Sequence, residues 1–396
     1  MRKHSPANCM VCNGTMFEHI QTQTLAQLDG GVCKVTFVLC ETCGHLQQMP
    51  PVPMETMAHH YKMFSSYELF GDAASLRTAA PSRHAERFLR IVEDLGLGPG
   101  RAYEIGCGAG EMLNQFQTLG WRVGGCDPAP AAASQAGSIF GIAVDIGGEE
   151  QFVPAQKKLD LVLLCHVLEH LYRPAETLHR IYGALAANGY LVFEVPCATA
   201  PHLLPPGWLT FEHLHYYTPE ILELLLYQTG FDVLEIRIAL KAEHYPVVTV
   251  AARKAAATRT VHTFIKGGSI ARTYVDRDEA MWGEARRRLG EISGPCFIWG
   301  AGVHTAQLLD HTKLAERIEI IGIVDRDSKK WGHTLAGAPV ISPGALWEYA
   351  SDAPIIVSSF VSEAAIAKSL RDAGIPLHRI VTIYADAPRP NEPGFA

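Results

Sequence analysis

Short apolar runs alternate with segments of helical spacing over most of the chain. In its first half they predict strands at 102–105, 122–126, 159–164 and 190–195, and helices around 84–95, 112–119 and 129–140. Such alternation is typical of βαβ units, in which crossover helices bury both faces of a parallel sheet. A helix near 219–229 and strands at 231–240 and 247–251 are expected next. The short link between these two strands predicts an antiparallel hairpin at the sheet edge.

A second series of the same kind begins near residue 296. It predicts strands at 296–299, 319–324, 355–358 and 380–383, and helices near 279–289, 345–349 and 363–372. Ahead of both series, residues 1–50 hold five of the ten cysteines. The predicted fold class is therefore α/β, with a cysteine module at 1–55, a central α/β domain at 56–253 and a second α/β domain at 254–396.

Composition narrows the class of protein. The 396 residues are 48% hydrophobic and 19% charged, which is typical of a globular protein with more than one core. A net charge of −7 argues against nucleic acid as a partner, because phosphate binding needs concentrated positive charge. No apolar run approaches the roughly 20 residues of a membrane helix, and none follows Met1 as in a secretory signal. We therefore expect a cytoplasmic protein with no membrane partner and with reduced or metal-bound cysteines.

Two pairs of cysteines near the N-terminus have the spacing of a metal site. Cys9 with Cys12, and Cys40 with Cys43, each form a Cys-x-x-Cys turn, and 27 residues separate the pairs. Two such turns can place four thiolates around one Zn²⁺ ion, and a site filled by four protein ligands is structural. We therefore expect structural zinc that helps a small module to fold. Two redox dithiols or four unrelated buried cysteines are the alternative.

The strongest chemical signal is the run E-I-G-C-G-A-G-E at 104–111, which follows an expected strand and opens a helix. Glycines let the backbone approach a ligand closely, and the helix N-terminus presents free amides. Dinucleotide sites share this pattern, but Glu104 would lie awkwardly beside a pyrophosphate. Asp127 ends the next strand, 21 residues after Gly106, where a carboxylate can bind both hydroxyls of a ribose. A nucleoside that carries an amino acid and no phosphate therefore fits better than NAD.

These residues resemble the S-adenosylmethionine site of class I methyltransferases. The likeness lies in 104–111, in G-C-D-P at 125–128 and in L-L-C-H-V-L-E-H-L at 163–171, and it covers about residues 85–250. It implies a Rossmann-like central domain. The cofactor-binding residues it implies are Glu104, Gly106, Gly108, Asp127, Asp145, Cys165 and His166. Of these, Asp145 would reach the adenine amine, while Cys165 and His166 would lie beside the adenine and sulfonium ends.

The third of these segments also contains His166-x-x-Glu169-His170, the inverted zinc-protease pattern. That motif needs a helix that carries all three residues on one face, and a further metal ligand downstream. Because His166 directly follows an expected strand, we interpret the spacing as coincidental.

Proton-transfer groups gather in the segment T-F-E-H-L-H-Y-Y-T-P-E at 210–220. It lies at the carboxyl edge of the predicted sheet, where open α/β folds bind ligands. Methyl transfer to a weak acceptor needs alignment and a base. We expect Glu212 or His213 to take part in this chemistry, the alternative being an ordinary aromatic loop that Thr218 caps.

The order of the three parts resembles the nucleotide-sugar C-methyltransferases, which methylate the carbon next to the ketone of a dTDP-keto-deoxysugar. The four cysteines match that family's zinc ligands, and the segments 61–67 and 211–217 are similar to its Tyr-rich and His-Glu-His-Leu segments. The resemblance implies a nucleotide-linked sugar as substrate. It also implies His213 as the base that forms an enolate, Glu212 as an orienting group, and Tyr67 and His170 as contacts to the sugar.

Two positions depart from that family, because Thr210 and Phe211 stand where it has Tyr and His. O- or N-methylation of another natural-product intermediate is therefore an alternative. A second glycine turn, Gly300-Ala301-Gly302, precedes a strand that ends at Asp325. In the resembled family this part is a pseudo-Rossmann domain that helps to hold the substrate, and an NAD-dependent oxidoreductase is the alternative from another class.

Overall fold

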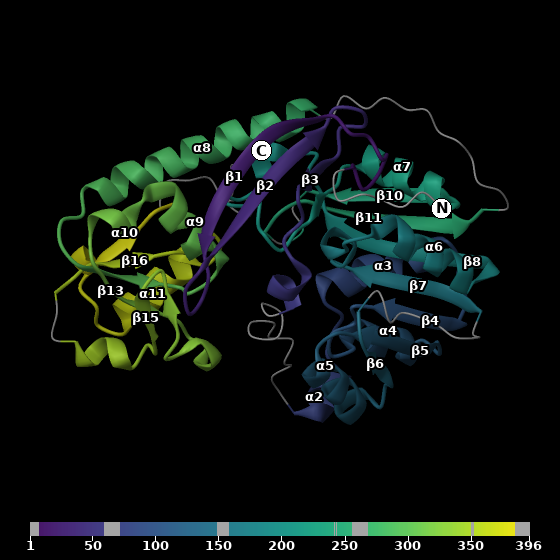
Figure 1. Ribbon diagram of the computed structural model, residues 1–396. Coiled ribbons are helices and arrows are strands. Elements are labelled where there is room, and N and C mark those ends of the chain that lie inside the picture. Colours follow the sequence, from purple (N-terminus) through teal and green to yellow (C-terminus); the bar gives the residue numbers. More distant parts are fainter. Residues whose placement is uncertain are drawn as a thin grey trace.

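The computed structural model describes residues 8–58, 72–148, 158–240, 242, 244–255, 268–349 and 352–384. These residues form three β-sheets. Figure 1 shows the central sheet on the right, the C-terminal sheet on the left and a long N-terminal hairpin between them. Tyr67 and the segment 61–67 lie outside the described residues.

The central sheet carries the first βα series, with its strands in the order β10-β11-β8-β7-β4-β5-β6. They are β4 (Arg101–Ile105), β5 (Arg122–Asp127), β6 (Val144–Ile146), β7 (Leu159–Cys165), β8 (Leu185–Pro196), β10 (Phe231–Ala239) and β11 (Val247–Lys254). Strands β8, β7, β4, β5 and β6 are parallel, whereas β11 pairs antiparallel with β8 and with β10. The structure thus confirms the predicted edge hairpin.

The order of the strands places a binding crevice at one edge of this sheet. From β4 the chain adds β5 and β6 on one side, and then crosses to β7 and β8 on the other. Open α/β sheets bind ligands at the carboxyl ends of the two strands where the order reverses. The carboxyl ends of β4 and β7 are therefore the expected position of a site.

Helices bury both faces of the central sheet, and alternate side chains of β7 show how. Leu161 and Leu163 pack with α3 and α4, whereas Val162 and Leu164 pack with α6 and α7. The helices of this part are α2 (Ala73–Arg77), α3 (Arg83–Asp94), α4 (Glu111–Thr118), α5 (Pro130–Gln135), α6 (Pro174–Ala184) and α7 (Pro219–Thr229). Single 3₁₀ turns span Leu168–His170 and Pro201–Leu203.

The N-terminal sheet has the order β1-β2-β3-β9 and is antiparallel throughout. Its strands are β1 (Phe17–Ala26), β2 (Val32–Cys40), β3 (Leu46–Gln48) and β9 (His215–Tyr216). The last strand comes from the segment in which the sequence predicts the acceptor chemistry. The cysteine module and the central part of the chain are therefore joined by backbone hydrogen bonds.

The C-terminal sheet has the order β14-β15-β13-β12-β16-β17, with only the β14–β15 pair antiparallel. The strands are β12 (Cys296–Trp299), β13 (Ile320–Val324), β14 (Thr334–Leu335), β15 (Ala338–Ile341), β16 (Ile355–Val357) and β17 (Ile380–Thr382). Its helices are α8 (Gly268–Gly290), α9 (Val303–Thr312), α10 (Leu314–Arg317) and α11 (Glu363–Asp372), with 3₁₀ turns at Ser328–Lys330, Ala345–Glu348 and Leu377–Arg379. The tip of the β1–β2 hairpin reaches this sheet, where Asp29 N–H donates to Thr334 O at 2.7 Å.

Three predicted elements differ from the structure. The helix expected over 129–140 ends at Gln135 and continues as a π-helical turn over Ala136–Phe140, which closes at Gly141 with φ of 70°. The helix expected at 279–289 begins earlier, at Gly268, because Ala271 and Tyr274 pack into a core with Trp208. A 3₁₀ turn over Ala345–Glu348 replaces the α-helix expected at 345–349. No described helix is long and apolar enough to cross a membrane.

Truncation of Leu163 tests the two-sided burial of the central sheet. Leu163→Ala should lower the free energy of unfolding by roughly 2–5 kcal/mol, because the fully buried site is left with a cavity. Leu234→Ala in β10, where the side chain is 38% exposed, should change it by less than about 0.5 kcal/mol. Urea unfolding measures both values, and equal losses would contradict the assigned packing.

Candidate active site

The glycine turn after β4 is tied to the neighbouring strand. The N–H groups of Gly106 and Cys107 donate to Cys126 O at 2.8 and 3.1 Å. Gly106 has φ of 70°, and a Cβ there would lie 2.5 Å from Val167 Cγ2, so no side chain fits. The turn therefore brings bare backbone against the segment that follows β7.

Asp127 and Glu104 supply two carboxylates beside this turn. Asp127 Oδ2 accepts the Gly108 N–H at 2.9 Å and Oδ1 accepts the Ala129 N–H at 2.8 Å, so each oxygen keeps one lone pair for a further donor. Glu104 is only 3% exposed, and its Oε2 has no hydrogen-bond partner among the residues that the structure describes. Burial, with the nearby charges of Asp127 and Glu111, raises the pKa of Glu104 to about 8. A buried acceptor without a donor suits a ligand that brings an ammonium group.

These observations test the fit of S-adenosylmethionine to the turn. The cofactor carries two ribose hydroxyls, which match the two lone pairs of Asp127, and an ammonium group, which matches Glu104. Asp145 lies within β6, one residue before its end, and accepts the Tyr103 hydroxyl at 3.1 Å. The structure thus gathers the predicted residues Glu104, Gly106, Gly108 and Asp127 in one place, with Asp145 on the next strand.

His166 links two buried carboxylates at the carboxyl ends of β7 and β8. It follows β7 directly with φ of 53°, and its Nδ1 lies 3.3 Å from Glu169 Oε1 while its Nε2 lies 3.5 Å from Glu194 Oε1. Burial works to lower the pKa of His166, but pairing with Glu169 and Glu194 outweighs it and raises the pKa to about 9. The ring is therefore an imidazolium at neutral pH. Cys165, the last residue of β7, has a pKa raised by burial and by the charge of Glu194.

Glu194 is held from several sides. The wholly buried carboxylate accepts Arg87 Nε at 2.5 Å and Nη2 at 2.7 Å, His84 Nδ1 at 2.6 Å and Thr249 Oγ1 at 2.7 Å. A buried charge is stable only when it is paired in this way. This network fixes helix α3 and strand β8 relative to His166.

Glu169, His170 and His213 form a second group next to His166. A potential ligand atom of each lies within 4.8 Å of the others, and the rings of His170 and His213 meet edge to face at 4.8 Å. His170 Nδ1 lies 2.8 Å from Glu212 O, so the ring donates to this carbonyl. Glu212 makes this contact through its backbone carbonyl, and the charge of its carboxylate works to raise the pKa of His213.

Neighbouring charges keep Glu169 charged, and burial keeps His213 neutral. Glu169 is 1% exposed, and within the described part of the chain neither of its oxygens has a hydrogen-bond partner. Burial works to raise its pKa, but pairing with His166 and the charges of His170 and His213 lower it to about 2. Burial, together with the charge of His170, lowers the pKa of His213 to about 4. His213 is therefore a neutral imidazole beside a fixed negative charge.

Two buried carboxylates at this place, Glu169 and Glu194, were not predicted from the sequence as site residues. Glu169 was set aside as part of a coincidental protease motif, and the structure shows a single 3₁₀ turn there rather than the helix that the motif needs. Glu194 lies within an apolar strand, L-V-F-E-V at 191–195. A lone carboxylate in such a run is costly unless paired, and that signal could have identified it.

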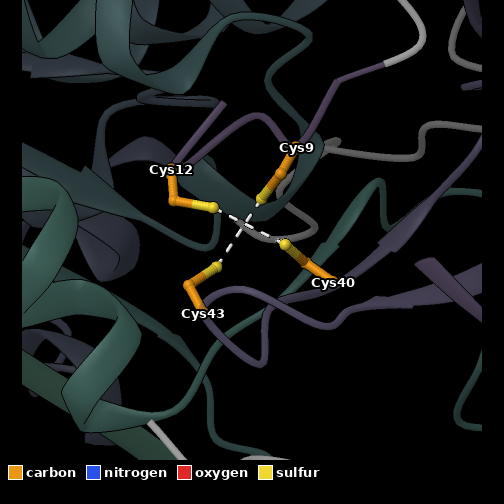
Figure 2. A group of neighbouring side chains, drawn as sticks. All are labelled: Cys9, Cys12, Cys40 and Cys43. Atoms are coloured by element: carbon orange, nitrogen blue, oxygen red, sulfur yellow. Dashed lines mark hydrogen bonds between the residues drawn. The ribbon is translucent and has the colours of Figure 1, made fainter. Parts of the chain in front are cut away.

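Figure 2 shows the four cysteines pointing toward one centre. Sulfur–sulfur distances are 3.7 Å for Cys9 and Cys43, and 3.5 Å for Cys12 and Cys40. Bonds of about 2.3 Å to a tetrahedral zinc ion place sulfurs roughly 3.8 Å apart, so the donor set fits this metal.

The second glycine turn repeats the architecture of the first. Asp325 Oδ2 accepts the Ala301 N–H at 2.7 Å and Oδ1 accepts the Asp327 N–H at 2.8 Å, as Asp127 does in the central sheet. Here Lys330 Nζ also lies 3.2 Å from Asp325 Oδ2. A lysine on this carboxylate competes with ribose hydroxyls, which is unfavourable for NAD.

Comparison with known proteins agrees with this geometry. Residues 76–236 match the family model of a methyltransferase domain, and residues 294–381 match one described as C2185-like, N-terminal. Two curated relatives are named ubiquinone biosynthesis O-methyltransferase. The one from Azorhizobium caulinodans is 28% identical over 39% of this chain and 65% of its own length, and that from Bradyrhizobium diazoefficiens is 32% identical over 27% and 44%.

Solved structures are less similar. One is a 1,6-didemethyltoxoflavin-N1-methyltransferase from Burkholderia thailandensis, with its substrate and S-adenosylhomocysteine bound; it is 18% identical, with a TM-score of 0.39, over 53% of this chain and 96% of that one. Another is an S-adenosylmethionine-dependent methyltransferase from Aquifex aeolicus, 19% identical with a TM-score of 0.36, over 47% and 100%. The chain spans 65% or less of the curated relatives that it matches. Residues 76–236 therefore match a methyltransferase domain, over less than half of the chain.

Proposed function

We propose that this enzyme transfers a methyl group from S-adenosylmethionine to a small molecule held between the glycine turn and His213. The observation that carries the proposal is the meeting of two groups of side chains at the carboxyl ends of β4 and β7. Glu104 and Asp127 offer acceptors to a nucleoside with an ammonium group. Glu169 and His213 offer a fixed charge and a neutral base on the other side of His166.

The cofactor supplies an electrophilic methyl group on its sulfonium. The chain's own task is to hold both partners in line and to exclude water, which accounts for much of the rate in such displacements. Asp127 would orient the ribose and Glu104 the ammonium group, while Gly106 and Gly108 keep the backbone close. His166 would bridge the two halves of the site.

We propose carbon as the accepting atom, next to the ketone of an activated, nucleotide-linked deoxysugar. Removal of the α-proton needs a neutral base, and burial keeps the His213 imidazole neutral. Glu169 would stabilise the imidazolium that forms, and His170 would face the developing enolate oxygen. The resemblance of residues 211–217 to the sugar C-methyltransferases supports this assignment.

Methylation of oxygen is the second candidate. The names of the curated relatives favour it, since they refer to O-methyltransferases. A phenolic acceptor would use the same base, because His213 can remove the hydroxyl proton as the methyl group arrives.

We also propose that Cys9, Cys12, Cys40 and Cys43 hold one structural zinc ion. The sulfur distances and the burial of the cluster support it. The ion would join the loop that precedes β1 to the end of β2. All four positions would be filled by protein, so its role is to stabilise the N-terminal sheet rather than to bind substrate.

Substitution of Asp127 tests cofactor binding. Asp127→Ala should weaken binding of S-adenosylhomocysteine at least about tenfold, or roughly 1.4 kcal/mol, because the ribose loses its acceptor. Isothermal titration of the full chain measures the affinity. Asp232→Ala is the control. This carboxylate lies 3.7 Å from Arg253 at the sheet edge, so its removal should leave the affinity unchanged. Heat from NAD and none from S-adenosylhomocysteine would contradict the proposal.

Hydrogen exchange tests the base. In D₂O, wild-type enzyme should exchange the hydrogen α to the ketone of a dTDP-linked keto-deoxysugar, as followed by NMR. His213→Ala should slow this exchange by at least about 100-fold while affinity for S-adenosylhomocysteine is unchanged. His202→Ala, at an exposed position, serves as control. Undiminished exchange in His213→Ala would exclude this base, and methylation of a catechol instead would favour oxygen as acceptor.

Metal analysis tests the cysteine cluster. We expect one zinc ion per chain by plasma mass spectrometry. Cys40→Ser should lose the metal and lower the melting temperature, because binding energy of the ion is folding energy. Cys33→Ser removes a buried cysteine outside the cluster, so this variant should retain the zinc ion. Full zinc content in Cys40→Ser would refute the site.

A further inference from the structure

The segment that carries Glu212 and His213 has no regular secondary structure of its own. Residues 207–213, which we name the acceptor loop, lie between the 3₁₀ turn at Pro201–Leu203 and strand β9. Trp208 is 5% exposed, Leu209 is wholly buried and Phe211 is 3% exposed. Buried backbone groups need hydrogen-bond partners, so those of the acceptor loop must come from elsewhere.

Three glutamine side chains donate to the carbonyls of this loop. Gln48 Nε2 lies within reach of Thr210 O at 3.1 Å, Phe211 O at 2.9 Å and His213 O at 2.9 Å. Gln23 Nε2 donates to Leu209 O at 3.0 Å, and Gln307 Nε2 to Leu209 O at 2.7 Å and Gly207 O at 3.0 Å. All three glutamines are 2% exposed or less. Water therefore does not replace these donors.

The three glutamines come from outside the methyltransferase domain. Gln23 lies on β1 and Gln48 on β3 of the N-terminal sheet, while Gln307 lies on α9 of the C-terminal part. The Gln307 amide also lies 3.4 Å from Gln23 Oε1. The two flanking parts of the chain thus meet each other at the carbonyl of Leu209.

Side chains of helix α8 accept hydrogen bonds from the backbone N–H groups at the start of the loop. Gly207 N–H donates to Asp278 Oδ1, and Trp208 N–H donates to Tyr274 Oη, both at 2.8 Å. Gly207 has φ of 71°, and a Cβ there would collide with Gln307 Oε1. The path of the loop is therefore defined on both its donor and its acceptor side.

We propose that Gln23, Gln48 and Gln307 are positioning residues, through which the N-terminal and C-terminal parts of the chain set the place of His213 relative to the cofactor. The inference rests on the proposed role of His213. It gives the flanking parts a task at the acceptor half of the site, because the side-chain hydrogen bonds described above join the three glutamines to the acceptor loop. Reacting groups displaced by about 1 Å can lose 100-fold in rate, so such a restraint affects turnover.

The test removes the amides and keeps the volume. We would compare Gln48→Met and Gln307→Met with the control Gln47→Met. Gln47 is the neighbouring residue on β3 and is 1% exposed, and its Oε1 accepts the Met10 N–H rather than a contact from the loop. If a methionine variant fails to fold, Gln48→Asn or Gln307→Asn takes its place, because asparagine keeps the amide but is shorter by one methylene. Zinc content and melting temperature are recorded for each full-length protein.

Hydrogen–deuterium exchange mass spectrometry is the first readout. In the Gln48 and Gln307 variants, exchange in peptides covering 207–214 should rise at least tenfold, while peptides covering 104–113 and affinity for S-adenosylhomocysteine stay at wild-type values. In the second readout, the NMR pH midpoint of the His213 ring should move toward that of free histidine, because a loosened loop admits water. Gln47→Met should change neither value.

An unchanged loop in both variants, or exchange that rises equally in all peptides, would overturn the inference. An unmoved His213 midpoint would also do so, since a merely structural role affects stability and not the environment of this ring. Failure of the proposed function is distinguishable, because wild-type protein would then bind no S-adenosylhomocysteine whatever the exchange of the loop.

Discussion

The bridge that His166 makes between Glu169 and Glu194 is the interaction on which both halves of the site depend. Two carboxylates buried this close would repel each other strongly, and the imidazolium between them removes that cost. Glu194 in turn holds α3 through Arg87. Glu169 lies beside His213, so the position of the proposed base is linked to the strands next to the glycine turn.

The rest of the chain serves the same junction. The strands of the parallel sheet end at a common edge, and the backbone groups of the loops at that edge need hydrogen-bond partners from elsewhere. Strand β9 obtains them by pairing with β3, and carbonyls of the acceptor loop accept from the buried amides of Gln23, Gln48 and Gln307. The cysteine cluster lies at one end of the N-terminal sheet, which carries two of these glutamines. The three sheets are thus connected to one another through the acceptor loop.

Local patterns were sufficient for much of this fold. Period-2 and period-3.6 spacing predicted the central strands and α7, and the glycine turn predicted a ligand beside Asp127, because these features depend on neighbours in sequence. The role of Gln48 could not be found this way, since its partners in the acceptor loop lie more than 160 residues away. The β1–β2 hairpin was also missed, because its strands mix polar residues such as Gln23 with apolar ones to meet another part of the chain. Predicting such contacts needs the tertiary structure.

The most direct test of the account is a crystal structure of the full chain with S-adenosylhomocysteine. The account predicts the ribose on Asp127, the amino group at Glu104 and the sulfur directed toward His170 and His213. Ligand bound instead at Gly300–Gly302, or with its sulfur turned away from His213, would contradict it.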